Sequence, residues 1–259
     1  MLADSISDSP QDVAIVDNQY RIISQLGQGG SSQVFSAVDA QGDMHAIKII
    51  RKDRNYTDDR AEHFILRENI VINKLGSHPN IIKSTECSTD GFINYNDSTL
   101  PIIYNVLEFC PNGTLSNFIK KTGPVEESIA RFYFWQLASA VFHLHSQGFA
   151  HLDIKLENIL LDELFNLKLA DLGASRCILA TNGYTDTKIG TPNYMAPEIE
   201  SKENELFHAL KADIYSLGIC LHLMLTGEFP NKYRSDETTN ECESQSTASE
   251  TSSIQEFDN

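Results

Sequence analysis

Cysteine is scarce in this sequence, and its spacing excludes the protein classes that depend on it. The five cysteines include no C-x-x-C pair and are scattered along the chain: Cys87, Cys110, Cys177, Cys220 and Cys242. Small secreted domains carry even disulfide sets and structural zinc sites carry paired cysteines, so we expect neither. A reducing compartment is the default for such a chain, which predicts a cytoplasmic location, with the nucleus as the alternative.

Basic residues are also few. Lysine and arginine number 20 against 36 aspartates and glutamates, which gives a net charge of -16. Because an acidic surface repels phosphate backbones, we do not expect nucleic-acid binding. The N-terminus has no basic region followed by an apolar core, and no apolar run approaches the roughly 18 residues that span a bilayer, so we expect no membrane segment.

The patterns that are present predict a fold of the α+β class. Alternating segments with glycine turns run from Tyr20 to Ile50 and indicate antiparallel strands. Helical periodicity follows over residues 58–76 and 126–148. Since strands come first and helices later, we expect a small sheet lobe followed by a helical lobe. The predicted buried face of the second helix consists of Ile129, Phe132, Trp135, Val141 and Leu144.

The two ends of the chain differ in composition from the middle. Residues 1–19 are polar and acidic, and we expect a flexible arm. Residues 231–259 hold seven acidic and two basic residues among Ser, Thr and Asn, and we expect a disordered acidic tail.

A glycine turn, "GQGG", joins two of the predicted strands. Gly27, Gly29 and Gly30 would let backbone N–H groups approach phosphate oxygens without a Cβ in the way. An ordinary hairpin turn explains the same residues equally well. A dinucleotide-binding unit is disfavoured, because it needs a helix after the glycines and "QVFSAV" reads as a strand.

A lysine and a glutamate each interrupt an apolar face. Lys48 shares its strand face with Ala46 and Ile50, and Glu68 shares a helical stripe with Ile65 and Ile72. A buried charge is costly unless it is paired, so we predict that Lys48 and Glu68 meet. The alternative is that each side chain reaches to an edge and places its charge in water.

Polar residues gather in the second half of the chain. Asp153 and Asn158 lie in a predicted loop, and Asp171 ends an apolar strand before Gly173. An Asn and an Asp that converge from two strand ends are suitable oxygen ligands for Mg²⁺, and a further acid nearby can accept a hydroxyl proton. Any single one of these residues could instead be a turn or capping residue.

Taken in order, the glycine loop, Lys48, Glu68, "HLDIKLEN", "DLG" and "APE" resemble the eukaryotic-type protein kinases of the serine/threonine class. The look of "LDIKLENILLD" and "KADIYSLG" is closest to calcium/calmodulin-dependent-type kinases. The resemblance implies a bilobal fold over residues 20–230, with an N-lobe of about 20–108, antiparallel strands and one main helix, and a mainly helical C-lobe of about 111–230.

The resemblance also implies roles for individual residues, with ATP as substrate and Mg²⁺ as metal. Leu107 would be the gatekeeper, Ser32 stands where a third glycine is frequent, and Asp213 would anchor the catalytic loop. The implied catalytic residues are Asp153, Lys155, Lys48 and Glu68. The implied metal ligands are Asn158 and Asp171. The implied ATP-binding residues are Gly27, Gln28, Gly29, Gly30, Val34, Ala46, Lys48, Glu108, Cys110 and Leu160. The implied substrate-holding residues are Thr191, Ala196, Pro197 and Glu198.

The resemblance also implies a class of substrate. Lys155 and "GTPNYMAPE" resemble serine/threonine rather than tyrosine kinases, so protein hydroxyls are the expected acceptors. Glu157 stands where kinases that prefer basic substrates often have a glutamate, which gives the hypothesis of basic protein substrates.

Three departures from the family pattern define what remains to be tested. Leu152 replaces an arginine that receives an activation-loop phosphate, so we expect activity to be uncoupled from phosphorylation of that loop. Leu172 replaces a phenylalanine, with little expected effect. Family helices are expected beyond Pro230 where this sequence turns polar, so we expect a truncated C-lobe with exposed apolar residues on the helix that carries Asp213, or a partner that covers them. The alternative to an active enzyme is a kinase-like scaffold that binds ATP or a partner without efficient phosphotransfer.

Overall fold

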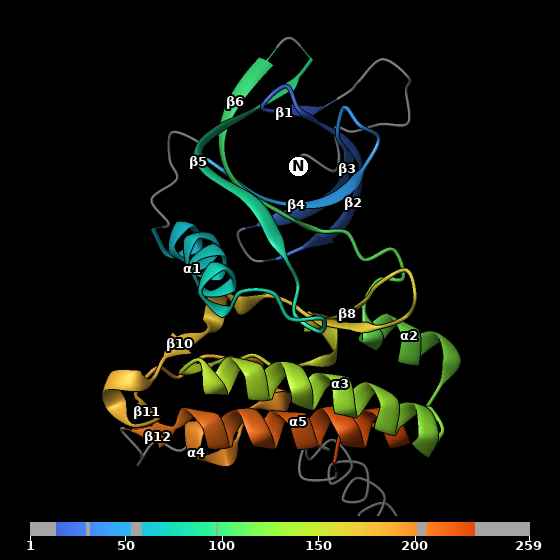
Figure 1. Cartoon of the computed structure of the whole chain (residues 1–259), viewed down its shortest axis with the longest axis vertical. Helices are drawn as coiled ribbons and strands as arrows, with labels where there is room; N and C mark the ends of the chain where they lie inside the picture. Colours follow the sequence, from blue (N-terminus) through green and yellow to red (C-terminus); the bar gives the residue numbers. More distant parts are fainter. Residues whose placement is uncertain (1–13, 30–31, 53–58, 97, 201–205, 231–259) are drawn as a thin grey trace, which may run out of the picture.

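The structure is a computed structural model that describes residues 14–29, 32–52, 59–96, 98–200 and 206–230. It has a sheet-rich lobe and a helical lobe, one above the other in Figure 1. The predicted bilobal α+β fold is therefore confirmed in its main features.

The sheet-rich lobe is a closed antiparallel barrel in the order β1-β2-β3-β4-β6-β5. Its strands in the described residues are β1 (Ile15–Val16), β2 (Tyr20–Gln28), β3 (Gln33–Val38), β4 (Met44–Arg51), β5 (Ser84–Tyr95) and β6 (Ser98–Glu108). The interior is apolar, with Phe35, Ile47, Ile102 and Val106 almost fully buried.

Strand β1 corrects the predicted N-terminal arm, which extended to residue 19. Ile15 pairs with Arg21 and with Asn94, so this strand joins β2 to β5 and closes the barrel. The physical reason is burial, because Ala14 and Val16 are buried in the barrel, and three of the four acidic residues of the predicted arm come before them. Residues 1–13, where the rest of the predicted arm falls, lie outside the described residues.

Helix α1 (Asp59–Leu75) contacts the barrel strands and the turn that follows β9 (Leu167–Leu169). Ile65, Glu68 and Ile72 are all buried, as their spacing predicted. Gly76 ends the helix with a φ of 67°, a left-handed conformation that favours glycine.

The helical lobe is built on two long helices that run side by side in Figure 1, α3 (Glu127–Ser146) and α5 (Ala209–Thr226). The shorter helices in the described part are α2 (Leu115–Thr122), α4 (Pro197–Glu200), η1 (Leu156–Asn158), η2 (Leu172–Ala174), η3 (Leu179–Thr181) and η4 (Pro192–Tyr194). The short strands here are β7 (Phe149–Ala150), β8 (Ile159–Leu161), β9, β10 (Arg176–Cys177), β11 (Tyr184–Thr185) and β12 (Phe207–His208). They pair two by two, as β8 with β9, β10 with β7 and β11 with β12.

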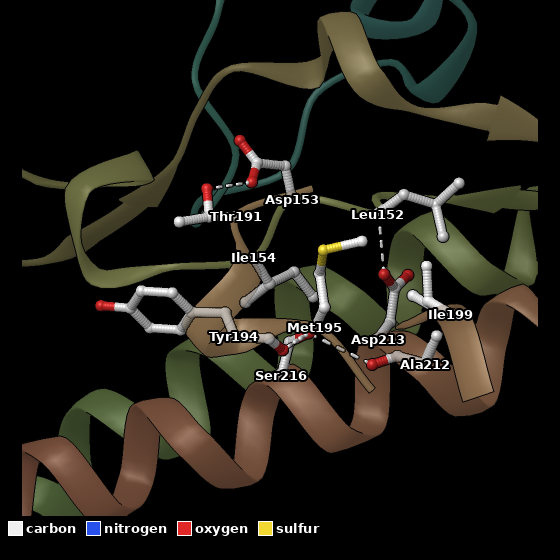
Figure 2. Close-up of a pocket in the computed structure, with 10 residues that line it drawn as sticks. All are labelled: Leu152, Asp153, Ile154, Thr191, Tyr194, Met195, Ile199, Ala212, Asp213 and Ser216. Atoms are coloured by element: carbon white, nitrogen blue, oxygen red, sulfur yellow. Dashed lines mark hydrogen bonds between the residues drawn. The ribbon is translucent and has the colours of Figure 1, made fainter. Parts of the chain in front are cut away.

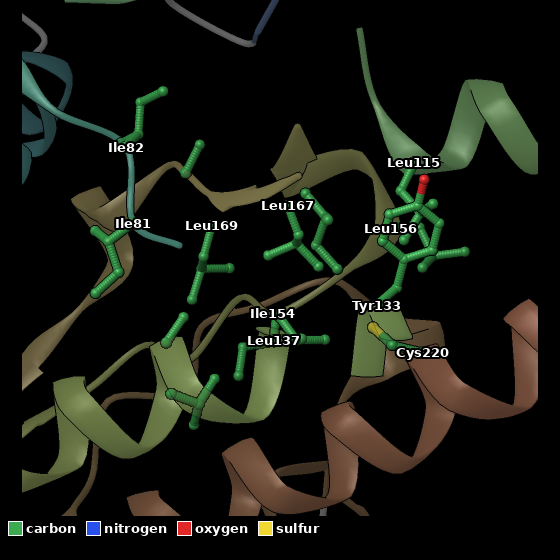
Figure 3. Close-up of a cluster of buried hydrophobic side chains, with 14 of the residues drawn as sticks. Ile81, Ile82, Leu115, Tyr133, Leu137, Ile154, Leu156, Leu167, Leu169 and Cys220 are labelled. Atoms are coloured by element: carbon green, nitrogen blue, oxygen red, sulfur yellow. The ribbon is translucent and has the colours of Figure 1, made fainter. Parts of the chain in front are cut away.

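The core of the helical lobe lies between α3, α5 and the β8–β9 hairpin. Figure 3 shows Leu137 of α3, Leu169 of β9 and Cys220 of α5 in this cluster. It continues toward the barrel through Ile81 and Ile82, which precede β5. The two lobes therefore share one apolar core at their junction.

The predicted buried face of α3 is partly wrong. Val141 and Leu144 are buried, but Ile129, Phe132 and Trp135 are exposed, Trp135 to 77%. The helix buries Tyr133, Leu137, Ala140, Val141 and Leu144 instead. Because apolar residues lie on both sides of this helix, the sequence pattern did not define which stripe faces the core.

Helix α5 is long and apolar enough, by length and composition, to cross a membrane. It packs against α3 and holds the buried carboxylate of Asp213, as a core helix of a globular domain does. Ile214 and Leu225 are exposed, whereas Leu217, Ile219, Leu223 and Met224 are buried, so the expected exposure holds only for the first two of these residues. The predicted tail and the expected truncation fall on residues 231–259, which lie outside the described residues.

Candidate active site

Lys48 lies between two carboxylates. Its ammonium nitrogen is 3.1 Å from Glu68 Oε2 and 2.8 Å from Asp171 Oδ1. The Glu68 side chain is 1% exposed and that of Lys48 is 12% exposed. Burial alone would lower the pKa of Lys48, but the two carboxylates raise it above its ordinary value, so the ammonium stays charged. The predicted Lys48–Glu68 pair is confirmed, and the alternative of separate side chains reaching to water is wrong.

Asp171 follows strand β9 in a left-handed conformation, with φ of 60°. Burial opposes its ionisation, but the nearby Lys48 ammonium lowers the pKa of Asp171. Gly173, two residues later, lets helix α1 approach this turn closely, since a Cβ on Gly173 would lie 2.9 Å from a ring carbon of Phe64. Leu172, the leucine that replaces the phenylalanine of the family pattern, is fully buried in the core cluster at the lobe junction.

Asp153 is the centre of a second polar cluster. Its Oδ1 accepts a hydrogen bond of 2.8 Å from the Thr191 hydroxyl, drawn in Figure 2. Its Oδ2 accepts from Lys155 Nζ at 2.8 Å and from Asn158 Nδ2 at 3.1 Å. Lys155 also donates to the Thr191 hydroxyl at 2.8 Å, so the loop and the later segment are joined around one carboxylate.

Asp213 of α5 holds the backbone of this loop from below. One carboxylate oxygen accepts from the Leu152 N–H at 2.8 Å and the other from the His151 N–H at 2.8 Å. The His145 ring lies 2.8 Å from the second oxygen. Leu152 has a φ of 66°, a strained conformation for leucine that these bonds maintain.

The Leu152 side chain packs into an apolar cluster. It is 5% exposed and belongs to a group with Ile178, Ala196, Ile199 and Ala212. Figure 2 shows it beside Ile199 and Ala212, in the wall of a small pocket beneath Asp153. An apolar contact therefore joins the loop to the later segment at the position where the family has a charged arginine.

The sequence did not predict a role for His151. Its side chain is fully buried, its Nδ1 accepts from the Asp153 N–H at 3.2 Å, and its Nε2–H donates to the Ala170 carbonyl at 3.2 Å. It therefore connects the Asp153 loop to the end of β9, next to Asp171. Its only sequence signal was its position in "HLD".

Four of the ATP-binding residues that the resemblance implies lie together. Val34, Ala46, Cys110 and Leu160 belong to or pack against the core cluster at the lobe junction, as does Leu107, the implied gatekeeper. Gly27 lies opposite Val34 in the β2–β3 pair, with Gln28 next to it. The Gly29 N–H donates to the Ser32 carbonyl at 2.7 Å, next to the ends of these two strands. Gly30 lies outside the described residues.

Glu157 lies exposed beside the loop. Its carboxylate accepts from the Ser116 hydroxyl at 2.9 Å and from the Tyr194 hydroxyl at 3.1 Å. Both partners are neutral donors, so the site keeps its negative charge. Glu198 in α4 forms no ion pair with any residue that the structure describes.

Comparison with known proteins agrees with this geometry. A family model for the protein kinase domain matches residues 20–258. The chain is 34% identical over 82% of its length to the cell cycle serine/threonine-protein kinase CDC5/MSD2 of Saccharomyces cerevisiae, of which it covers 28%. It is 37% identical over 83% of its length to CBL-interacting serine/threonine-protein kinase 7 of Arabidopsis thaliana, of which it covers 48%. It is 36% identical over 84% of its length to CBL-interacting protein kinase 11 of Oryza sativa, of which it covers 41%.

The chain thus spans about a quarter to a half of the length of these relatives. The family match covers both lobes and reaches into residues 231–258. With the motifs, the bilobal fold and the two polar clusters in the expected order, the chain belongs to the protein kinase domain family.

Proposed function

We propose that this chain is an ATP-dependent serine/threonine protein kinase, which transfers the γ-phosphate of ATP to protein hydroxyls. The observation that carries the proposal is the assembly of two polar clusters at the lobe junction. Lys48, Glu68 and Asp171 form one, and Asp153 with Lys155 belongs to the other. A kinase-like scaffold would not need both clusters intact, so they favour the enzyme.

In this proposal the proton moves to the chain's own carboxylate. The substrate hydroxyl donates its proton to Asp153 while its oxygen forms a bond to the γ-phosphorus, and the bond from that phosphorus to the bridging oxygen breaks to release ADP. Lys48 holds the α- and β-phosphates, and Glu68 fixes the position of its ammonium. Lys155 stabilises charge on the transferred group.

The donor atoms fit a magnesium ion. Asn158 uses its amide nitrogen to donate to Asp153, and Asp171 uses Oδ1 for Lys48, so Asn158 Oδ1 and Asp171 Oδ2 accept no hydrogen bond from the part of the chain that the structure describes. Among the residues that the structure describes, no group of three or more His, Cys, Asp or Glu could hold a metal alone. Mg²⁺ needs no such group, because it takes one or two protein ligands plus phosphates and water. When bound, it would neutralise phosphate charge.

The acceptor class is proposed from the Thr191 region and from Glu157. The hydrogen bonds from Thr191 and Lys155 to Asp153 support a serine or threonine acceptor. The exposed carboxylate of Glu157 supports a preference for basic residues near the acceptor. Equal phosphorylation of acidic and basic peptide libraries would contradict that preference.

Two further proposals concern the surroundings of the protein. A partner that covers the C-lobe would contact the exposed Ile214 and Leu225 of α5.

A cytoplasmic location is supported by free thiols at Cys87, Cys110, Cys177 and Cys220, the cysteines that the structure describes.

The test of the function is phosphotransfer from radiolabelled Mg-ATP to serine, threonine and tyrosine peptide libraries. We expect label on serine and threonine peptides and none on tyrosine peptides. Thermal shift with Mg-ATP measures nucleotide binding separately, because a ligand that binds the folded state raises the melting temperature.

A further inference from the structure

A buried lysine outside the predicted site crosses the lobe junction. Lys168 of β9 has a side chain that is only 9% exposed, and its Nζ lies 2.5 Å from Glu108 Oε1 at the end of β6. Lysine is almost never buried unless it is paired. The ion pair therefore connects the last residue of the barrel sheet with the hairpin of the helical lobe.

Glu108 is also held on its other side. Its second carboxylate oxygen accepts from the Lys83 N–H at 3.3 Å, and its own N–H donates to the Lys83 carbonyl at 2.9 Å. The backbone of Glu108 is thus fixed between the segment before β5 and Lys168. The family resemblance implies that the backbone of Glu108, with that of Cys110, forms the hinge that meets adenine.

Lys168 lies next to Leu160, which the resemblance implies lies below adenine as the floor of its site. In the β8–β9 pair it is directly opposite Leu160, and opposite residues of an antiparallel pair project from the same face. Its charge also reaches the hinge thiol. Burial raises the pKa of Cys110 to about 12, with Glu108 acting in the same direction and Lys168 acting against it. The Lys168 side chain therefore lies beside both Leu160 and Glu108, two of the residues implied to bind ATP.

We infer that Lys168 is a positioning residue for nucleotide binding. Its ion pair with Glu108 holds the hinge at a fixed position relative to the β8–β9 hairpin. The inference rests on the proposed kinase function. The lysine touches none of the atoms proposed to react, so it should affect binding of the adenine end and leave the phosphoryl-transfer step nearly unchanged. Glu108→Gln should have the same effect, because it removes the other charge of the pair.

The experiment measures KM for ATP, kcat and direct ATP binding for Lys168→Met, Lys168→Arg, Glu108→Gln and the swap Lys168→Glu with Glu108→Lys. We expect Lys168→Met and Glu108→Gln to raise KM and Kd about tenfold with kcat within about threefold of wild type. Lys168→Arg and the charge swap should recover much of the loss. The matched control is Lys52→Met, since Lys52 donates to the Thr89 carbonyl at 2.6 Å far from the hinge, and it should change nothing.

Amide hydrogen exchange supplies a readout without turnover. In Lys168→Met, exchange should rise in the hinge residues 108–113 and stay unchanged in α3 and α5. The positioning role would be contradicted if the wild type binds ATP and Lys168→Met leaves the KM for ATP unchanged. A fall in kcat as large as the rise in KM would contradict it too. Failure of wild type itself to bind Mg-ATP would refute the kinase proposal, and the positioning role with it.

Discussion

Replacing Leu152 by alanine should loosen the segment that carries Thr191. Leu152 is 5% exposed and packs in a cluster with Ile178, Ala196 and Ile199, all of which follow the Asp171 turn. Core leucine-to-alanine changes lower the free energy of unfolding by about 2–5 kcal/mol. This cluster is small and borders loops that can relax, so we expect about 2–3 kcal/mol.

That loss can be measured as a shift in melting temperature. For a chain of this size each kcal/mol corresponds to about 2–4 °C, so Leu152→Ala should lower the melting temperature by about 4–12 °C. We expect kcat to fall as well, because Thr191 and Lys155 donate to the same carboxylate across this contact. Circular dichroism melting and the peptide phosphorylation assay measure the two effects.

The matched control is Leu164→Ala, the same change at a side chain that is 75% exposed in the β8–β9 turn. It should alter the free energy of unfolding by no more than about 0.5 kcal/mol. If Leu152→Ala melts within the range of Leu164→Ala, the apolar anchor at this position does not exist and the reasoning is refuted.

Three further predictions test the activation segment, the support of the Asp153 loop by Asp213, and the pH dependence of folding stability. Changing the hydroxyl residues of the activation segment to Ala or Phe should leave kcat within a few-fold, and a loss above about a hundredfold would contradict the uncoupling; these residues are Thr181, Tyr184, Thr185 and Thr187. Asp213→Asn should lower the free energy of unfolding by about 2–4 kcal/mol, since one buried N–H loses its charged acceptor, and an effect no larger than that of Asp162→Asn, which also accepts from two backbone N–H groups, would contradict it. His78 stacks on His143 with ring centroids 4.9 Å apart, and burial followed by His143 lowers the pKa of His78. The unfolded chain therefore binds that proton more readily, so stability should fall as pH drops below the ordinary value of about 6.5, and an equally steep fall in His78→Gln would exclude this cause.

The parts of the fold that follow from local chemistry could be predicted from the sequence. Lys48 and Glu68 each interrupt an apolar face, and mutual pairing is the cheapest way to bury both charges. The glycine turn between alternating segments identified the β2–β3 hairpin for a similar local reason.

The parts that were missed depend on contacts between distant segments. Strand β1 has two residues and is defined by its partners in β2 and β5, which no local pattern shows. Lys168 meets Glu108 across 60 positions of the chain, and an isolated lysine in "NLKLAD" carries no signal for that. The wrong face of α3 has a different cause, because Trp135 and Leu137 are both large and largely apolar, and only packing shows which of them is buried.

The most direct test of the central claim is phosphotransfer by the whole chain, with Asp153→Asn as the comparison. Asparagine keeps the size of the side chain and removes the carboxylate that accepts from Thr191 and Lys155. We predict Mg-ATP-dependent labelling of serine and threonine peptides by the wild type, and a loss of at least about a hundredfold in the variant while nucleotide binding persists. Labelling by the wild type no higher than that by the variant would contradict the account.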